Sequence, residues 1–157
     1  MRKLFIGLLS FVVVVSGYAQ SSDRTFGATW RQMSKEQKEM LIMGTTAGIR
    51  MASTYFGYTE AQRRGSSDDN MIELLAVKCA KALTLQMGPT RVVELFNNLY
   101  ADDRNLVIPF DNAYRYLLRV YGGEKMSEKE SEKLLDFIRN DFRSRLSQSS
   151  GNSISRK

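Results

Sequence analysis

The sequence contains no histidine and a single cysteine, Cys79. Without histidine the chain lacks the most common general base, the most common zinc ligand and every nucleophilic triad built on imidazole. One cysteine cannot form a disulfide within the chain, so the folded core has to be stable without one. These absences exclude whole reaction classes. We predict no metal site and no cofactor, and we assign no catalytic residue.

Long hydrophobic runs are also scarce, and the one that stands out lies at the start. Residues 4–15 are apolar, follow Arg2 and Lys3, and precede the small and polar residues 16–20. This order is typical of a signal peptide with cleavage near Ala19. The run has about 12 residues, whereas a helix needs about 20 to cross a bilayer. We therefore expect a signal peptide at 1–20, no stable membrane anchor after cleavage, and a periplasmic or secreted protein.

Charge of either sign is in small excess only. Removing Arg2 and Lys3 with the signal peptide leaves a mild positive balance, which mainly affects solubility and encounter with partners. The balance does not indicate a nucleic-acid partner. Basic residues gather near the C-terminus, where we expect a solvated helix face and tail. A module that binds anionic polymers or a membrane surface through this region is an alternative. The basic residues are Arg139, Arg143, Arg145, Arg156 and Lys157.

No segment alternates with a period of two for long enough to form a strand, and apolar residues recur at helical spacing instead. Ser34 with Gln37 and Ser127 with Glu130 are capping boxes, and the two prolines stand where helices can begin. We predict an all-α, compact bundle of about five helices. Four of the expected helices span residues 34–56, 89–100, 109–121 and 127–146. The fifth begins at the capping cluster 66–69 and ends at Gly88.

The same pattern divides the chain into four parts. We expect a lead segment at 21–33 after the signal peptide, a helical domain at 34–146, and a tail at 147–157. The tail is rich in serine, asparagine and glycine, so we expect it to be disordered.

Three features of the helices have a structural and a functional interpretation. Gly44, Gly48 and Ala52 remove bulk from one helix face, which favours tight packing inside the monomer over a docking surface for a ligand or partner helix. Cys79 lies on an apolar stripe and is expected in the core. The aspartates and asparagines of 97–112 favour turn chemistry over a calcium site.

Carboxylates are the remaining groups that could perform acid–base chemistry. A small hydrolase acting on envelope glycan is therefore an alternative function, although nothing in the sequence pairs these side chains and a solvated helix face is the favoured interpretation. The candidates are Glu36, Glu39, Glu60, Glu73 and Glu94.

Most aromatic residues fit helical stripes, but Tyr58 and Tyr116 do not. Tyr116 lies close in sequence to Arg115 and Arg119. Tyrosine and arginine are favoured anchors of protein interfaces. We therefore predict that Tyr58, Tyr116, Arg115 and Arg119 contribute to a partner-binding surface.

Several short segments resemble small exported bacterial helical proteins of unassigned role and, distantly, the Tai-type periplasmic immunity proteins. The resemblance covers roughly residues 30–122, and it implies a protein that binds and silences a secreted cell-wall amidase. It assigns no functional residue. The segments are 33–38, 42–48, 92–96, 100–105 and 108–109.

Taken together, these patterns favour an exported bacterial envelope protein that acts by protein–protein interaction, including the inhibitor or immunity type. The expected partner is another envelope or secreted protein. The oligomeric state stays open at this stage.

Overall fold

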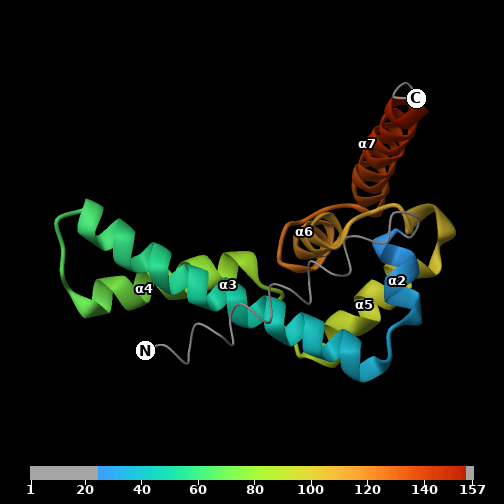
Figure 1. Cartoon of the computed structure of the whole chain (residues 1–157). Coiled ribbons are helices and arrows are strands. Elements are labelled where there is room, and N and C mark those ends of the chain that lie inside the picture. The colour runs from blue at the N-terminus through green and yellow to red at the C-terminus, as the bar shows by residue number, and fades with distance from the viewer. Residues whose placement is uncertain (1–24, 155–157) are drawn as a thin grey trace, which may run out of the picture.

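The structure, a computed structural model, describes residues 25–154, which form helices and no strand (Figure 1). The all-α helical bundle predicted from the sequence is confirmed. The predicted signal peptide lies outside the described residues. The helices are α2 (Phe26–Gln32), α3 (Lys35–Arg63), α4 (Asp69–Leu83), α5 (Pro89–Ala101), α6 (Phe110–Tyr121) and α7 (Glu128–Ile154), with a 3₁₀ turn, η1, at Asp103–Asn105.

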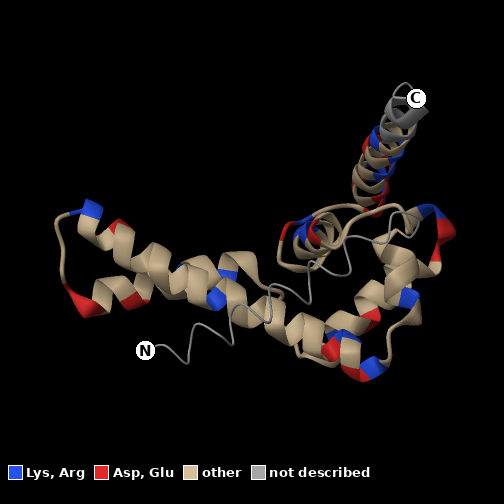
Figure 2. Ribbon diagram, viewed as in Figure 1, with Lys and Arg blue, Asp and Glu red and all other residues tan. Residues whose placement is uncertain are grey.

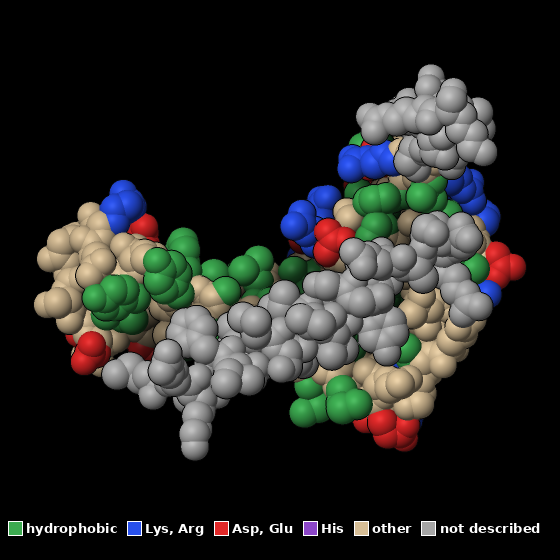
Figure 3. Space-filling model, in the orientation of Figure 1, with side chains coloured by type: hydrophobic (Ala, Val, Ile, Leu, Met, Phe, Trp, Pro, Cys, Tyr) green, Lys and Arg blue, Asp and Glu red, His purple; other side chains and the backbone are tan. Residues whose placement is uncertain are grey.

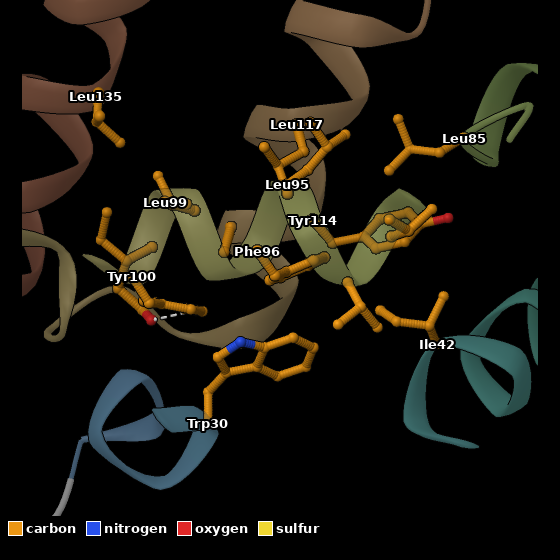
Figure 4. Close-up of a cluster of buried hydrophobic side chains, with 14 residues drawn as sticks. Trp30, Ile42, Leu85, Leu95, Phe96, Leu99, Tyr100, Tyr114, Leu117 and Leu135 are labelled. Atoms are coloured by element: carbon orange, nitrogen blue, oxygen red, sulfur yellow. Dashed lines mark hydrogen bonds between the residues drawn. The ribbon is translucent and has the colours of Figure 1, made fainter. Parts of the chain in front are cut away.

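The hydrophobic core is centred on α5, which α2, α3 and α6 surround (Figures 1 and 4). Aromatic rings make up its middle: the Trp30 and Phe96 centroids lie 4.9 Å apart, and Phe96 stacks on Phe110 at 5.2 Å. The apolar residues that recur at helical spacing along α5 are buried in this core. They are Val92, Val93, Phe96, Leu99 and Tyr100.

Helix α2 lies in the segment that we expected only to lead into the domain. Trp30 anchors it with a fully buried side chain whose Nε1–H donates to Asn97 Oδ1 over 3.0 Å. Gly27 lets its backbone approach the chain closely, since a Cβ there would lie 2.6 Å from the Leu106 Cα. A helix of 7 residues is too short to show a clear period in the sequence, so tertiary packing defines it.

The expected end of the first long helix is wrong. Helix α3 continues through Gly57 to Arg63 and stops at Gly65, whose φ of 71° suits glycine. The Gly65 and Ser66 N–H groups donate back to Gln62 and Ala61, as in a Schellman motif.

The other helix ends are partly as expected. Both predicted capping boxes are present, at Ser34 and at Ser127. Helix α4 ends at Leu83 instead of reaching Gly88, because Thr84 and Leu85 turn into the core. Helix α7 runs to Ile154 and so includes residues 147–154, which we expected to belong to a disordered tail. Residues 155–157 lie outside the described range.

Two arginines fix the connection between α5 and α6. Arg31 donates to the carbonyls of Tyr100 and Ala101, at 2.6 and 2.7 Å. Arg139 has a side chain that is only 3% exposed, and its Nε–H donates to Asn105 Oδ1 over 2.6 Å. Arg139 is therefore not part of a solvated basic face, because it is needed inside to bind this turn.

The carboxylates around Arg139 complete its environment. Its Nη1 donates to Asp136 at 2.6 Å and to Glu132 at 2.9 Å, one turn and two turns earlier on α7. The guanidinium charge is thus balanced at the site, as a buried arginine requires. Arg145 is also paired, with Asp141 at 2.8 Å. The basic C-terminal region offers fewer free cations than its sequence suggests.

Candidate interaction surface on the helical arm

Helix α4 and the outer part of α3 form a hairpin that extends from the core (Figure 1). We call residues 44–83 the arm. Its two helices meet through small residues: Ser53, Gly57 and Ala61 are buried on the α3 side. A Cβ at Gly57 would lie 2.5 Å from the Ile72 carbonyl oxygen and 3.1 Å from the Ala76 Cβ. The backbones are therefore packed as closely as these residues allow.

As a result of this packing, many large apolar side chains of the arm lie on its outside. Tyr55 is 72% exposed, Met51 65% and Leu74 53%. No residue of α4 is fully buried, although the helix has an apolar stripe. The space-filling view shows hydrophobic side chains along the arm (Figure 3). Further exposed members are Phe56, Tyr58, Val77 and Leu83.

The surface of α3 is also poor in charge. Arg50 is the one charged residue of residues 40–59, and most of the helix is uncharged in Figure 2. The threonine hydroxyls are satisfied within the helix: Thr45 donates to the Leu41 carbonyl at 2.8 Å, and Thr59 to that of Tyr55 at 3.1 Å. Such hydroxyls do not need water, so a partner can cover this surface at low cost.

One side of the arm is hollowed into an open groove of about 460 Å³ between α3 and α4. Apolar side chains of α4 form much of its lining, and charged side chains stand among them. The apolar residues are Ile72, Ala76, Val77 and Ala80, and the charged ones are Arg50, Asp69, Glu73 and Lys81.

Two of the three small residues singled out in the sequence do not pack inside the monomer. Gly48 and Ala52 are exposed, and a Cβ at Gly48 would have no described neighbour within 4 Å. Our preference for tight packing inside the monomer is therefore wrong for Gly48 and Ala52, whereas Gly44 is half-buried. The stripe that packs on α4 is displaced around the helix and is formed by Ser53, Gly57 and Ala61.

The four residues predicted to bind a partner do not form one surface. Tyr58 is 49% exposed on the outer part of α3, while Arg115, Tyr116 and Arg119 lie on α6, beside the core (Figure 1). Arg115 and Arg119 are exposed, and Arg119 pairs with Glu124 at 3.0 Å.

Tyr116 is half-buried and packs against the core. Burial raises the pKa of its hydroxyl, and the Ser131 side chain opposes this by a hydrogen bond. It contributes to packing between α6 and α7. The arm was missed as a site because its apolar stripes have the spacing of buried helix faces, and spacing alone does not show whether a neighbour covers them.

The carboxylates considered for acid–base chemistry are dispersed. Arg63 and Arg64 bind Glu60 and lower its pKa to about 2, and the backbone and Ser34 lower that of Glu36. Glu94 is paired with Arg91 at 2.6 Å, and Glu39 accepts from the Thr90 hydroxyl. A general acid needs a raised pKa, which the environments of Glu36 and Glu60 oppose.

The remaining candidates of the sequence have structural settings. Cys79 is half-buried on α4 instead of lying in the core. Asp102 caps η1 and Asn105 donates to the Leu99 carbonyl at 2.6 Å, as expected of turn residues. Within residues 25–154, no cysteine or carboxylate side chains gather in a group able to hold a metal ion. No helix in that range has the length and apolar character needed to cross a membrane.

Comparison with known proteins adds no relative: no family model, curated protein or solved structure matches the chain.

Proposed function

We propose that this protein is exported to the envelope and acts by binding another protein, with the arm as its binding element. The packing of the arm carries the proposal, because small residues lie between its helices and large apolar residues lie outside. Soluble proteins rarely leave a contiguous apolar surface uncovered, and such surfaces mark interaction sites.

The groove between α3 and α4 supports a protein partner in particular. Its apolar lining with neighbouring charges has the composition of an interface core and rim. An amphipathic helix or an apolar loop of the partner would bind there through a few inserted side chains. The resemblance to Tai-type immunity proteins supports a secreted envelope enzyme as the partner, which the binding would silence.

The test is capture of the tagged protein's partner from an extract of the cell envelope, with quantitative mass spectrometry. We expect one protein to be retained in stoichiometric amount by the wild type and lost with Val77→Glu, since Val77 is 42% exposed and lines the groove. Phe137→Glu is the matched control, because Phe137 is 71% exposed on α7, away from the arm.

Each outcome has a clear meaning. If the wild type retains no protein, binding of an envelope protein is rejected. If Val77→Glu retains the same partner as fully as Phe137→Glu does, the groove is rejected as the binding site.

A further inference from the structure

One face of α3 points away from α4 and carries a regular series of residues. At 3.6 residues per turn, its members lie between about 100° and 180° around the helix from Gly57, which faces α4. They are separated alternately by four and three residues, which is the spacing of helices that pair along their length. We call this series the seam; it consists of Gly44, Gly48, Met51, Tyr55 and Tyr58.

The order of sizes along the seam makes it complementary to itself. Two glycines come first and the large side chains follow. When two copies of α3 lie antiparallel, with the midpoint between Gly48 and Met51, Tyr55 of one copy falls opposite Gly44 of the other. Met51 then falls opposite Gly48. A parallel pair would place tyrosine on tyrosine and leave a gap between glycines, so the antiparallel pair packs better.

The large side chains of the seam leave a sizeable apolar area exposed. Met51 is 65% exposed, Tyr55 72% and Tyr58 49%. At about 200 Å² for each whole side chain, these three leave about 370 Å² uncovered per copy. Two copies would bury about 740 Å² through these side chains, and the glycine backbone with the flanking side chains brings the pair towards the roughly 1,000 Å² expected of a specific interface.

Charge does not oppose this association. The flanking positions Thr45, Ala47, Ala52 and Thr59 are uncharged, and the two threonine hydroxyls already donate to backbone carbonyls of α3. Arg50 lies on the other side of the helix, where it lines the groove. Pairing of the seams therefore buries no charge and leaves neither threonine hydroxyl unsatisfied.

We propose that two copies of this chain associate as a two-fold symmetric dimer, with their α3 seams antiparallel. A two-fold axis suits the seam because the same surface is used by both copies. The seam is a different face of α3 from the one that lines the groove, so the dimer does not depend on the proposed partner.

The first test is sedimentation of the processed protein over a range of concentrations. We expect a dimer for the wild type and for Tyr121→Glu, a matched control because Tyr121 is a 52% exposed tyrosine on α6. Tyr55→Glu should raise the dissociation constant at least about a hundredfold: loss of one buried aromatic anchor weakens binding more than tenfold, and each dimer contains two. A monomeric wild type, or an unchanged constant for Tyr55→Glu, overturns the proposal.

The second test fixes the direction of pairing by disulfide formation in a Cys79→Ser background. Chains carrying Gly44→Cys are mixed with chains carrying Tyr55→Cys and then oxidised. If the pair is antiparallel, a disulfide forms between a Gly44→Cys chain and a Tyr55→Cys chain. Neither variant then forms a disulfide with its own copies. If each variant instead links to its own copies, the antiparallel seam is wrong.

Discussion

Three glycines in and after α3 perform three different physical tasks. Gly57 lets the Ile72 backbone approach, Gly65 takes the positive φ that ends the helix, and Gly48 leaves open space on the outer face. All three are the same letter in the sequence. The sequence predicts that the helix ends just before Gly57, because a glycine after an apolar stripe commonly has that role. Only the position of α4 shows whether a glycine ends the helix or allows close contact with a neighbouring helix.

Alanine substitution distinguishes these tasks. Gly57→Ala should lower the free energy of unfolding by about 1–3 kcal/mol, because the new Cβ forces the α3 and α4 backbones apart. Gly48→Ala is the matched control and should raise it by up to about 1 kcal/mol, since alanine favours a helix and meets no described neighbour. Urea denaturation measures the free energy of unfolding of both variants. The protein is kept dilute, so that the seams are unpaired.

The comparison would fail in one way. If Gly57→Ala were as stable as Gly48→Ala, the two helices could not be in backbone contact at residue 57.

Arg139 is a second residue whose role depends on its surroundings. Its neighbours in sequence suggested an exposed basic face, but the side chain lies under the turn at Asn105 and is balanced by Asp136 and Glu132. Two of these partners are on α7 itself, at spacings of three and seven residues. Such spacings are common on solvated helices, so the sequence does not show that a turn 34 residues earlier covers this face.

At the scale of elements, the helix caps could be predicted from the sequence better than the helix lengths. Capping boxes act through local hydrogen bonds, so Ser34 and Ser127 could be recognised from four consecutive residues. Helix α2 and the ends of α3 and α4 depend on contacts with distant residues such as Asn97 and Ala76. The all-α class follows from helical periodicity alone, whereas these boundaries follow from packing.

The turn between α5 and α6 has a pH dependence of its own. Hydrogen bonds from Arg104, with help from Arg139, lower the pKa of Asp102 to about 2 from an ordinary value of 3.8. The unfolded chain therefore takes up this proton first as the pH falls. The stabilisation from Asp102 is complete above about pH 5 and is lost progressively from about pH 4 towards pH 2.

Asp102→Asn tests this dependence, since asparagine can still cap η1 but does not titrate. We expect the free energy of unfolding of the wild type to fall more steeply than that of the variant between pH 4 and pH 2. From pH 5 to pH 7 the free energies of unfolding of the wild type and the variant should change in parallel. Parallel behaviour at every pH would contradict the proposed coupling of this carboxylate to the turn.

At the scale of the whole molecule, the chain contains two differently stabilised parts. Helix α5 has six buried residues at the centre of the aromatic core, whereas α4 has no fully buried residue and packs mainly on α3. Apolar stripes in the sequence predicted both helices, and they do not show this difference. The candidate surface could not be predicted for the same reason, since an exposed stripe and a buried one have equal spacing.

Hydrogen exchange measures the difference directly. Local opening is easiest where few apolar contacts are buried, so amides of α4 in dilute protein should be at least about tenfold less protected than those of α5. Raising the protein concentration should increase the protection of the amides of residues 44–59, because the seams pair. The protection of amides in α5 and α6 should stay the same. Protection of α4 equal to that of α5 in dilute protein would mean that the arm is not the weaker part of the fold. Concentration-independent exchange of 44–59 over the range in which the protein dimerises would place the dimer contact elsewhere.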